Sequence, residues 1–273
     1  MASVPDATAA TSFVGTIPEN YDRGLGPVFF ADFAEAMARR VGELAPRRVL
    51  ETSAGTGIVT RWMRDLLPAA SELIATDLNP PMLDVARSKF AAGERIDFQP
   101  ADATDLPFPD REFDAVVCQF GVMFFPDKDR SYREAYRVLQ PGGHYLFSVW
   151  DAHRFNPAPR LVHEMLRELF PADPPQFYAV PFSYCQIDPI KAALSDCGFT
   201  GFRADVLSID KRVADLPGFA RGLILGNPVV EQIRGRGGDP DAVIERVTEA
   251  LRREFGDPPQ VPLQVIFFQA TRP

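Results

Sequence analysis

The stretch Val49–Thr60, VLETSAGTGIVT, joins a short apolar run to a turn of small residues and then to the start of an amphipathic pattern. The residues RRVLE at 47–51 are typical of a buried strand, and apolar residues at helical spacing predict a helix over 58–67. Glycines in the connecting turn allow the backbone to approach a ligand closely. In an open α/β sheet, the turn after the first strand is a usual place for a ligand.

The same strand–helix alternation continues along the chain. Further apolar strands are predicted at 72–77, 95–99, 113–120 and 144–150, and helices at 27–44, 79–92 and 131–139. Strands that are apolar throughout and alternate with helices indicate a mostly parallel sheet covered on both faces, the doubly wound, Rossmann-like α/β class. Residues 1–20 are expected to precede this unit as a flexible segment.

The last third of the chain begins with a predicted helix at 188–199 and a strand at 202–210. A second helix is predicted at 239–255, with Asp239 as its N-cap and a proline in its first turn. The final run, PLQVIFFQA at 262–270, is almost wholly apolar. It should therefore be a central strand of the sheet and not an edge strand.

Composition and charge limit the function classes. The chain has 273 residues, 46% of them hydrophobic, and a formal net charge of −8 with no concentrated basic stripe, which disfavours nucleic acid as a partner. Cys118, Cys185 and Cys197 are too far apart for a disulfide framework or a zinc knuckle, and no cluster has metal-ligand spacing. The sequence shows no secretory signal and no apolar run long enough to span a membrane, so a cytoplasmic protein is expected.

The residues around the turn indicate its ligand. No lysine follows the glycines, which excludes a P-loop, and Thr60 stands where a dinucleotide fingerprint has a glycine or alanine. Glu51 ends the first strand and suits a cationic group, while Asp77 ends the second strand and can accept hydrogen bonds from a ribose diol. Asp102, after the third strand, is placed to accept from an exocyclic amine. An ammonium, a ribose and an adenine without phosphate together describe S-adenosylmethionine.

Four segments resemble motifs I, post-I, II and III of class I S-adenosylmethionine-dependent methyltransferases, in particular the ubiquinone/menaquinone-biosynthesis-like (type 11/25) group. In chain order they are VLETSAGTG, IATDLNPPML, QPADATDLPFPDREFDAVVCQFGVMFF and EAYRVLQPGGHYLFSVW. The resemblance covers about residues 20–150, and four motifs in this order are highly specific. It implies a seven-stranded sheet in the order 3-2-1-4-5-7-6 with strand 7 antiparallel, together with helical lid insertions.

The resemblance also implies cofactor contacts. Glu51 matches the acid near the methionine ammonium, and Asp77 matches the acid that binds the ribose. The other matching positions are Tyr21, Ser53, Ala54, Gly55, Gly57, Leu78, Met82, Asp102, Ala103 and Gln119. Tyr21 is the aromatic residue that would close over the cofactor. Ser53 replaces the family's first glycine, so its side chain must either fit within the turn or bind the ligand.

The expected reaction is an SN2 methyl transfer from S-adenosylmethionine to oxygen or carbon of a small or medium hydrophobic acceptor, with S-adenosylhomocysteine as product. Alignment and desolvation can supply the catalysis, so a base is not obligatory; His153 and His163 are the candidates. Two alternatives remain open, an NAD-dependent oxidoreductase and a non-catalytic S-adenosylmethionine-binding protein. No metal is expected.

The domain organisation follows from the same pattern. The chain is expected to form a single methyltransferase domain, 1–273, that binds a small-molecule acceptor, and a homodimer remains open. Its core is predicted at about 28–150 and 184–273, with lid segments at about 1–27, 151–183 and 211–260. The last two of these connections leave the carboxyl edge of the sheet, where the cofactor is expected.

Overall fold

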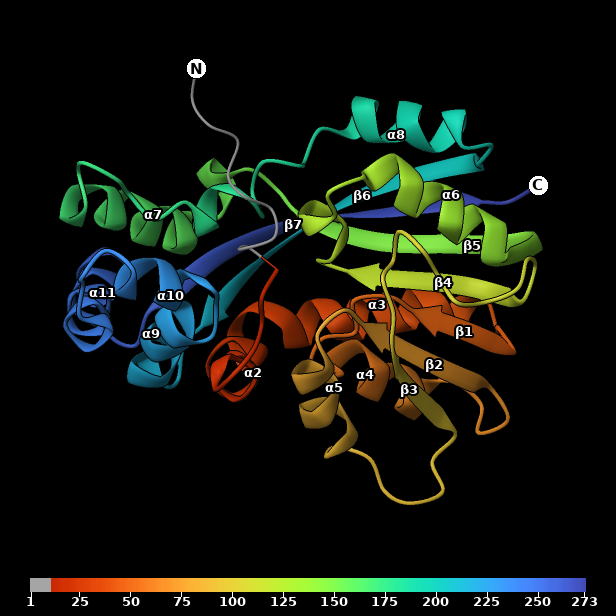
Figure 1. Cartoon of the computed structure of the whole chain (residues 1–273), viewed down its shortest axis with the longest axis horizontal. Coiled ribbons are helices and arrows are strands. Elements are labelled where there is room, and N and C mark those ends of the chain that lie inside the picture. Colours follow the sequence, from red (N-terminus) through yellow and green to blue (C-terminus); the bar gives the residue numbers. More distant parts are fainter. Residues whose placement is uncertain (1–10) are drawn as a thin grey trace.

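A computed structural model describes residues 11–273 as one seven-stranded sheet with helices on both faces (Figure 1). The strands are β1 Arg48–Glu51, β2 Glu72–Asp77, β3 Ile96–Pro100, β4 Phe113–Gln119, β5 Leu139–Trp150, β6 Thr200–Arg212 and β7 Gln260–Thr271. Their order is β3-β2-β1-β4-β5-β7-β6. The first five strands pair in parallel, and β7 is antiparallel to both β5 and β6. The predicted fold class, strand order and central position of the last strand are confirmed.

Helices cover the two faces of this sheet as the strand–helix alternation predicted. One face carries α3 Ala31–Glu43, α4 Ile58–Leu66 and α5 Pro80–Arg87, and the other carries α6 Lys128–Val138 and α8 Ile187–Asp196 (Figure 1). The predicted strand at 144–150 is longer in the structure, because β5 already begins at Leu139 and includes the QPGG segment. None of the helices in residues 11–273 is long and apolar enough to cross a membrane.

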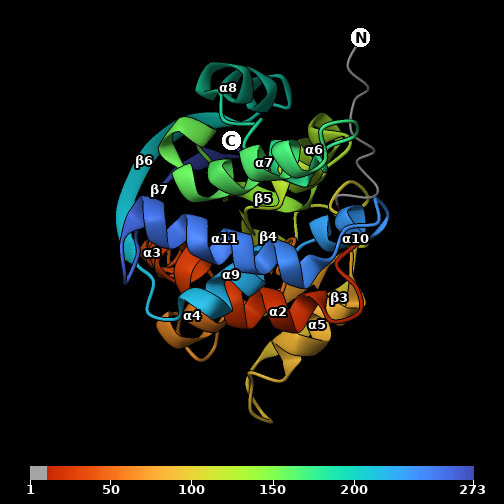
Figure 2. The same ribbon diagram turned by 90° about the vertical axis from the view of Figure 1, so that its left-hand side faces the viewer.

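Additional helices gather beyond the carboxyl ends of the parallel strands, and Figure 2 views this end of the molecule. They are α2 Ile17–Asn20, η1 Tyr21–Phe30, α7 Pro157–Leu169, α9 Leu216–Leu225, α10 Val229–Arg234 and α11 Pro240–Phe255, with single turns η2 Val122–Phe124, η3 His153–Phe155 and η4 Phe177–Ala179. Asp239 caps α11 as predicted, since its side chain accepts a hydrogen bond from the Asp241 N–H. Helical insertions are therefore present at the end of the sheet where a ligand is expected.

The N-terminal region corrects one sequence prediction. The helix expected over 27–44 begins earlier in the structure, where α2 and η1 precede α3, and η1 is a π-helix. Residues 17–20 are therefore helical and not a flexible segment; residues 1–10 of that predicted segment lie outside the described part of the chain. Pro27 lies inside η1 and has no N–H to donate to an α-helical hydrogen bond, which explains why the sequence predicts a helix that starts at this proline and not before it.

Close packing between η1 and α9 holds these two segments together. A Cβ atom added to Gly24 would lie 2.6 Å from the Cα atom of Gly222, so the two backbones touch directly. Only glycine permits such an approach. The N-terminal helix and the insertion between β6 and β7 are therefore packed as one unit over the end of the sheet.

Candidate functional site

The turn after β1 is built around left-handed backbone conformations. Ser53, Gly55 and Gly57 have φ angles of 53°, 57° and 75°. A left-handed conformation costs a non-glycine residue about 1–2 kcal/mol, yet Ser53 fits because Gly121 lies opposite it. A Cβ atom on Gly121 would lie 2.5 Å from the Cβ atom of Ser53. The turn therefore accommodates the serine that replaces the family's glycine.

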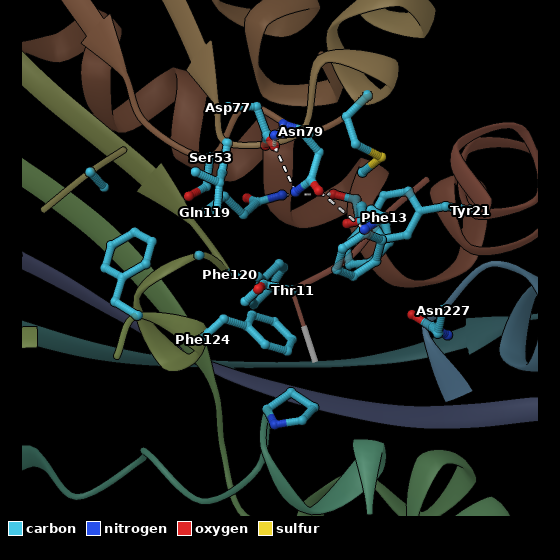
Figure 3. Close-up of a pocket in the computed structure, with 18 of the residues that line it drawn as sticks. Thr11, Phe13, Tyr21, Ser53, Asp77, Asn79, Gln119, Phe120, Phe124 and Asn227 are labelled. Carbon is cyan, nitrogen blue, oxygen red and sulfur yellow. Dashed lines mark hydrogen bonds between the residues drawn. The ribbon is translucent and has the colours of Figure 1, made fainter. Parts of the chain in front are cut away.

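Asp77, at the end of β2, connects this turn to the next strand. Its Oδ2 atom accepts a hydrogen bond of 2.9 Å from the Gly55 N–H, and its Oδ1 atom accepts from the backbone N–H of Asn79 at 2.8 Å. The Asn79 Nδ2 atom donates to the same Oδ1 at 3.3 Å (Figure 3). Burial raises the pKa of Asp77, and these donors lower it. The carboxylate is thus held at the carboxyl end of β2, facing the cavity.

Glu51 is 2% exposed at the end of β1. Its Oε2 atom accepts a hydrogen bond of 2.6 Å from the hydroxyl of Thr60. Burial raises the pKa of Glu51 to about 8, and the Thr60 hydroxyl opposes that shift. Thr60, which departs from a dinucleotide fingerprint, therefore has a defined role here, because it supports a buried acid beside the turn.

One main cavity of about 290 Å³ lies at this end of the sheet (Figure 3). The residues predicted from the sequence that line it are Tyr21, Ser53, Gly55, Asp77, Leu78, Met82, Asp102, Ala103 and Gln119. A side cavity of about 30 Å³ is lined by Glu51 and Ala54, and by Tyr21, Ser53, Gly55 and Gln119 again. Gly57 is absent from the described lining of both cavities; a Cβ atom there would lie 2.8 Å from that of Ala86, so it allows α4 and α5 to pack closely.

Two polar residues of the cavity have contrasting hydrogen bonding. The Oδ1 atom of Asp102 accepts from both the N–H and the hydroxyl of Thr104 at 2.8 Å, which fixes the loop after β3. The Oε1 atom of Gln119, at the end of β4, is buried and has no hydrogen-bond partner among residues 11–273. A buried amide oxygen without a donor is costly, so Gln119 is suited to a ligand that donates.

An aromatic wall completes the main cavity, and half of it comes from the stretches GVMFF and PQFYAVPFSYC, whose position after the fourth and fifth strands predicts an apolar pocket. Its members are Phe13, Phe29, Phe30, Phe120, Phe124, Phe125, Trp150, Phe177, Tyr178 and Phe182. The backbone N–H of Phe13 donates to Asn79 Oδ1 at 3.2 Å, which ties the N-terminal segment to the end of β2. The one feature of the sequence that could have indicated Phe13 as a cavity residue is that it is a lone aromatic residue in a stretch rich in alanine and threonine. Asn227, which also lines the cavity, had no comparable signal.

Tyr21 and Phe30, at the two ends of η1, stack with ring centroids 4.6 Å apart and planes 18° apart. They are nine positions apart, and in an α-helix with 3.6 residues per turn they would lie on opposite sides. The π-helix closes wider turns, from residue i to i+5, so that two turns take about nine residues. The π-helical winding therefore places both rings on the face that borders the cavity.

His153 and His163 are absent from the described lining of the main cavity. Their ring centroids lie 5.4 Å apart, and the His153 ring packs 4.5 Å from that of Phe182, which does line the cavity. Burial lowers the pKa of both histidines, and His163 lowers that of His153 further. The pair lies behind the cavity wall. No group of three or more His, Cys, Asp or Glu in the described chain could hold a metal ion.

Comparison with known families assigns the central part of this site. Residues 50–147 match the family described as "Methyltransferase domain". By this match, residues 50–147 carry a methyltransferase domain. The match begins inside β1 and ends inside β5, so this domain includes Glu51, Asp77, Asp102 and Gln119. The resemblance derived from the sequence motifs is confirmed.

Curated relatives of the methyltransferase domain are enzymes of quinone biosynthesis by name. A stretch of 102 residues is 45% identical to a demethylmenaquinone methyltransferase of Thermus thermophilus. The stretch covers 37% of this chain and 46% of that protein. A stretch of 108 residues is 39% identical to the ubiquinone/menaquinone biosynthesis C-methyltransferase UbiE of Hahella chejuensis, or 38% of this chain and 43% of that protein. The aligned region thus spans about half the length of these relatives.

Solved structures share the fold of the methyltransferase domain. YcgJ from Bacillus subtilis is 21% identical with a TM-score of 0.58, covering 88% of this chain and 98% of that one. Phosphoethanolamine N-methyltransferase 2 from Haemonchus contortus is 18% identical with a TM-score of 0.64, covering 100% of this chain and 60% of that one. At these identities the likeness concerns the fold alone.

Proposed function

We propose that this chain is an S-adenosylmethionine-dependent methyltransferase that acts on a hydrophobic aromatic acceptor. The observation that carries the proposal is that one cavity is lined both by Asp77 and Asp102 and by the aromatic wall. A cofactor and an acceptor bound in one cavity can be placed in line for direct methyl transfer.

The residues present fit this cofactor. Among the described residues, the lining of the main cavity contains two aspartates and no lysine or arginine. This negative charge disfavours a pyrophosphate ligand. Gln119 Oε1 and the Glu51 carboxyl border the side cavity and can accept hydrogen bonds from an ammonium group. Asp77 accepts three hydrogen bonds within the chain, and since a carboxylate offers about four lone-pair sites, one remains for a ribose hydroxyl.

When bound, S-adenosylmethionine supplies an electrophilic methyl group; a bond forms from the acceptor to this methyl carbon, and the broken carbon–sulfur bond leaves its electron pair on the thioether. The chain's own contribution is to position the cofactor and the acceptor and to exclude water. Asp77 and Asp102 hold the polar end, and the aromatic wall desolvates the acceptor. No histidine, lysine or cysteine is in the described lining, so the wall offers no strong base and the acceptor's proton leaves to solvent.

We further propose carbon as the methylated atom and the ring of a reduced quinone (a hydroquinone) as the acceptor. Support comes from the names of the curated relatives, demethylmenaquinone methyltransferase and UbiE C-methyltransferase. The ten aromatic side chains of the wall also suit a flat apolar ring. A ring carbon needs no base before attack, because its proton becomes acidic only after the new bond has formed.

We propose that residues 11–273 act as one domain, in which η1, α7, α9, α10 and α11 form the lid over the acceptor. The backbone contact between Gly24 and Gly222 supports a lid that moves as one unit.

Isothermal titration calorimetry with S-adenosylmethionine, S-adenosylhomocysteine and NAD tests the cofactor. Micromolar binding of the first two ligands, without binding of NAD, is expected. Incubation with methyl-labelled S-adenosylmethionine and a reduced naphthoquinone then tests transfer. Binding of NAD alone would indicate an oxidoreductase, and cofactor binding without transfer to any aromatic acceptor would indicate a binding protein.

A further inference from the structure

Asn227 lies in the turn between α9 and α10, outside the region matched by the methyltransferase family. It is 5% exposed and lines the main cavity. Figure 3 shows it across the cavity from the group formed by Ser53, Asp77 and Gln119. It is therefore a buried polar group at the acceptor end, separate from the residues that fit the cofactor.

The hydrogen bonds of Asn227 fix the orientation of its amide. The Nδ2 atom donates to the backbone carbonyls of Leu223 at 3.2 Å and Gly222 at 3.5 Å, and it lies 3.3 Å from the hydroxyl of Tyr178. Both carbonyls belong to the last turn of α9, and that of Gly222 also accepts from the backbone N–H of Gly226. Turning the amide over would place its oxygen against two carbonyl oxygens, so the NH₂ group must face α9.

Tyr178 supports the same orientation. Its hydroxyl donates to the Leu223 carbonyl at 2.5 Å, so its only proton is already used and it can only accept from Asn227. With the NH₂ group held on this side, the Oδ1 atom faces the cavity, as Figure 3 shows. No donor to this atom is found among residues 11–273, so an acceptor oxygen is presented to whatever ligand the aromatic wall encloses.

The chemistry of this arrangement selects a ligand. Most side chains around it are apolar, so little else offsets the desolvation of the Asn227 oxygen. A ligand that carries a hydroxyl or N–H group at this edge satisfies the oxygen. A ligand with a carbonyl there places two acceptors against each other, and one with only C–H or halogen groups leaves the oxygen unpaired.

We propose that Asn227 is the specificity-determining residue of the acceptor site and selects aromatic ligands that donate a hydrogen bond, such as phenols, over those that cannot. The inference rests on the proposed function, because that function makes this end of the cavity the acceptor site. Asn227 fixes the rotation of the ring in the cavity, and so determines which ring atom faces the cofactor end.

Two probes of nearly the same shape test the inference. 1-Naphthol can donate a hydrogen bond and 1-fluoronaphthalene cannot. Ligand-observed NMR titration of the wild-type protein, saturated with S-adenosylhomocysteine, is expected to show about tenfold tighter binding of 1-naphthol. Equal binding of the two probes overturns the inference before any variant is made.

Variants assign the preference to Asn227. In Asn227→Leu the ratio of the two affinities is expected to fall to about one, while S-adenosylhomocysteine binding stays at the wild-type level. Asn227→Ala serves as a second variant should the leucine variant fail to fold. Gln119→Leu makes the matched amide-to-leucine change at the cofactor end, and it should weaken S-adenosylhomocysteine binding but preserve the probe ratio. A preference that persists in both Asn227 variants contradicts the proposal.

The two proposals fail in different ways. With intact S-adenosylhomocysteine binding, the role of Asn227 alone is overturned by equal binding of the two probes to the wild type, or by a preference that persists in both Asn227 variants. Absence of S-adenosylhomocysteine binding, with a probe preference that still depends on Asn227, overturns the proposed methyl transfer and leaves Asn227 as the donor-recognising residue of an apolar ligand site.

Discussion

At its Asp77 end the main cavity is built from the ends of β1, β2 and β4, and at its Asn227 end from η1, η4 and the turn after α9. The first end is polar, and its acids accept hydrogen bonds from nearby backbone and side-chain groups. The second end is aromatic, and its segments meet through packing and through the hydrogen bonds of Tyr178. The family match over residues 50–147 includes the acids of the first end and leaves out most of the second. The contrast suggests a fixed chemistry at one end and a variable substrate at the other.

The largest expected effect separates the two ends directly. Asp77→Ala removes an acceptor for the Gly55 and Asn79 N–H groups and for the ligand's ribose. Loss of several charge-assisted hydrogen bonds should weaken S-adenosylhomocysteine binding about 100-fold or more, measured by calorimetry. Asp84→Ala is the matched control, because Asp84 is an exposed residue of α5 paired with Arg87, and exposed pairs contribute little. Near-normal affinity of Asp77→Ala would contradict the assignment of the polar end.

The second prediction concerns the aromatic end. Gly24→Ala places a Cβ atom 2.6 Å from the Gly222 backbone and must separate η1 from α9. Overpacking of this kind costs about 1–3 kcal/mol, so the melting temperature should fall by several degrees and 1-naphthol should bind more weakly. Gly42→Ala in α3 meets nothing within 4 Å and should leave the protein equally or slightly more stable. Equal melting temperatures for both variants would show that the backbone contact is not needed.

Tyr21 borders both the main and the side cavity and therefore tests how sharply the two ends are separated. Its ring stacks on Phe30, and burial raises the pKa of its hydroxyl, which stays neutral. Tyr21→Ala should weaken both S-adenosylhomocysteine and 1-naphthol by about tenfold, since an aromatic contact and its buried area are lost. Tyr21→Phe retains the ring and should change each affinity less than twofold. A large effect of Tyr21→Phe would assign the role to the hydroxyl instead.

The same contrast explains what the sequence could predict. The acids at the polar end each follow a short apolar strand, so local pattern alone placed Glu51, Asp77 and Asp102 at one edge of the sheet. The sheet order, including the antiparallel last strand, came from a resemblance based on four local motifs. From the sequence, Thr60 is noted only because it does not fit a dinucleotide fingerprint. Its hydrogen bond to Glu51 could not be predicted, since no sequence motif pairs these two positions.

Other parts of the aromatic end could not be predicted in this way. Phe13 lies in a stretch taken as flexible, and its position depends on Asn79, which is 66 residues away in the chain. Asn227 stands in a Gly-Asn-Pro turn that is typical of any loop, and its orientation depends in part on Tyr178, which is 49 residues away in the chain. The π-helix over Tyr21–Phe30 requires a wider turn that helical periodicity does not reveal.

The smallest expected effect is the release of a proton from Glu51, at the polar end, when the ligand binds. With a pKa of about 8 in the free protein, Glu51 is roughly nine-tenths protonated at pH 7. A bound ammonium group favours the carboxylate and lowers that pKa, so the complex holds fewer protons than the free protein. Binding of S-adenosylhomocysteine should therefore release close to one proton at pH 7, and its affinity should rise with pH up to about 8.

Calorimetry in two buffers of different ionisation enthalpy counts this proton. Glu51→Gln should abolish most of the release, because the amide cannot ionise but can still accept from Thr60. Glu35→Gln, on α3 and paired with Arg39, should release the same number as the wild type. Equal release from Glu51→Gln and the wild type would place the ammonium group elsewhere. The polar end would then bind its ligand through Asp77 and Asp102 alone, and Glu51 would serve only to hold Thr60 and the turn after β1.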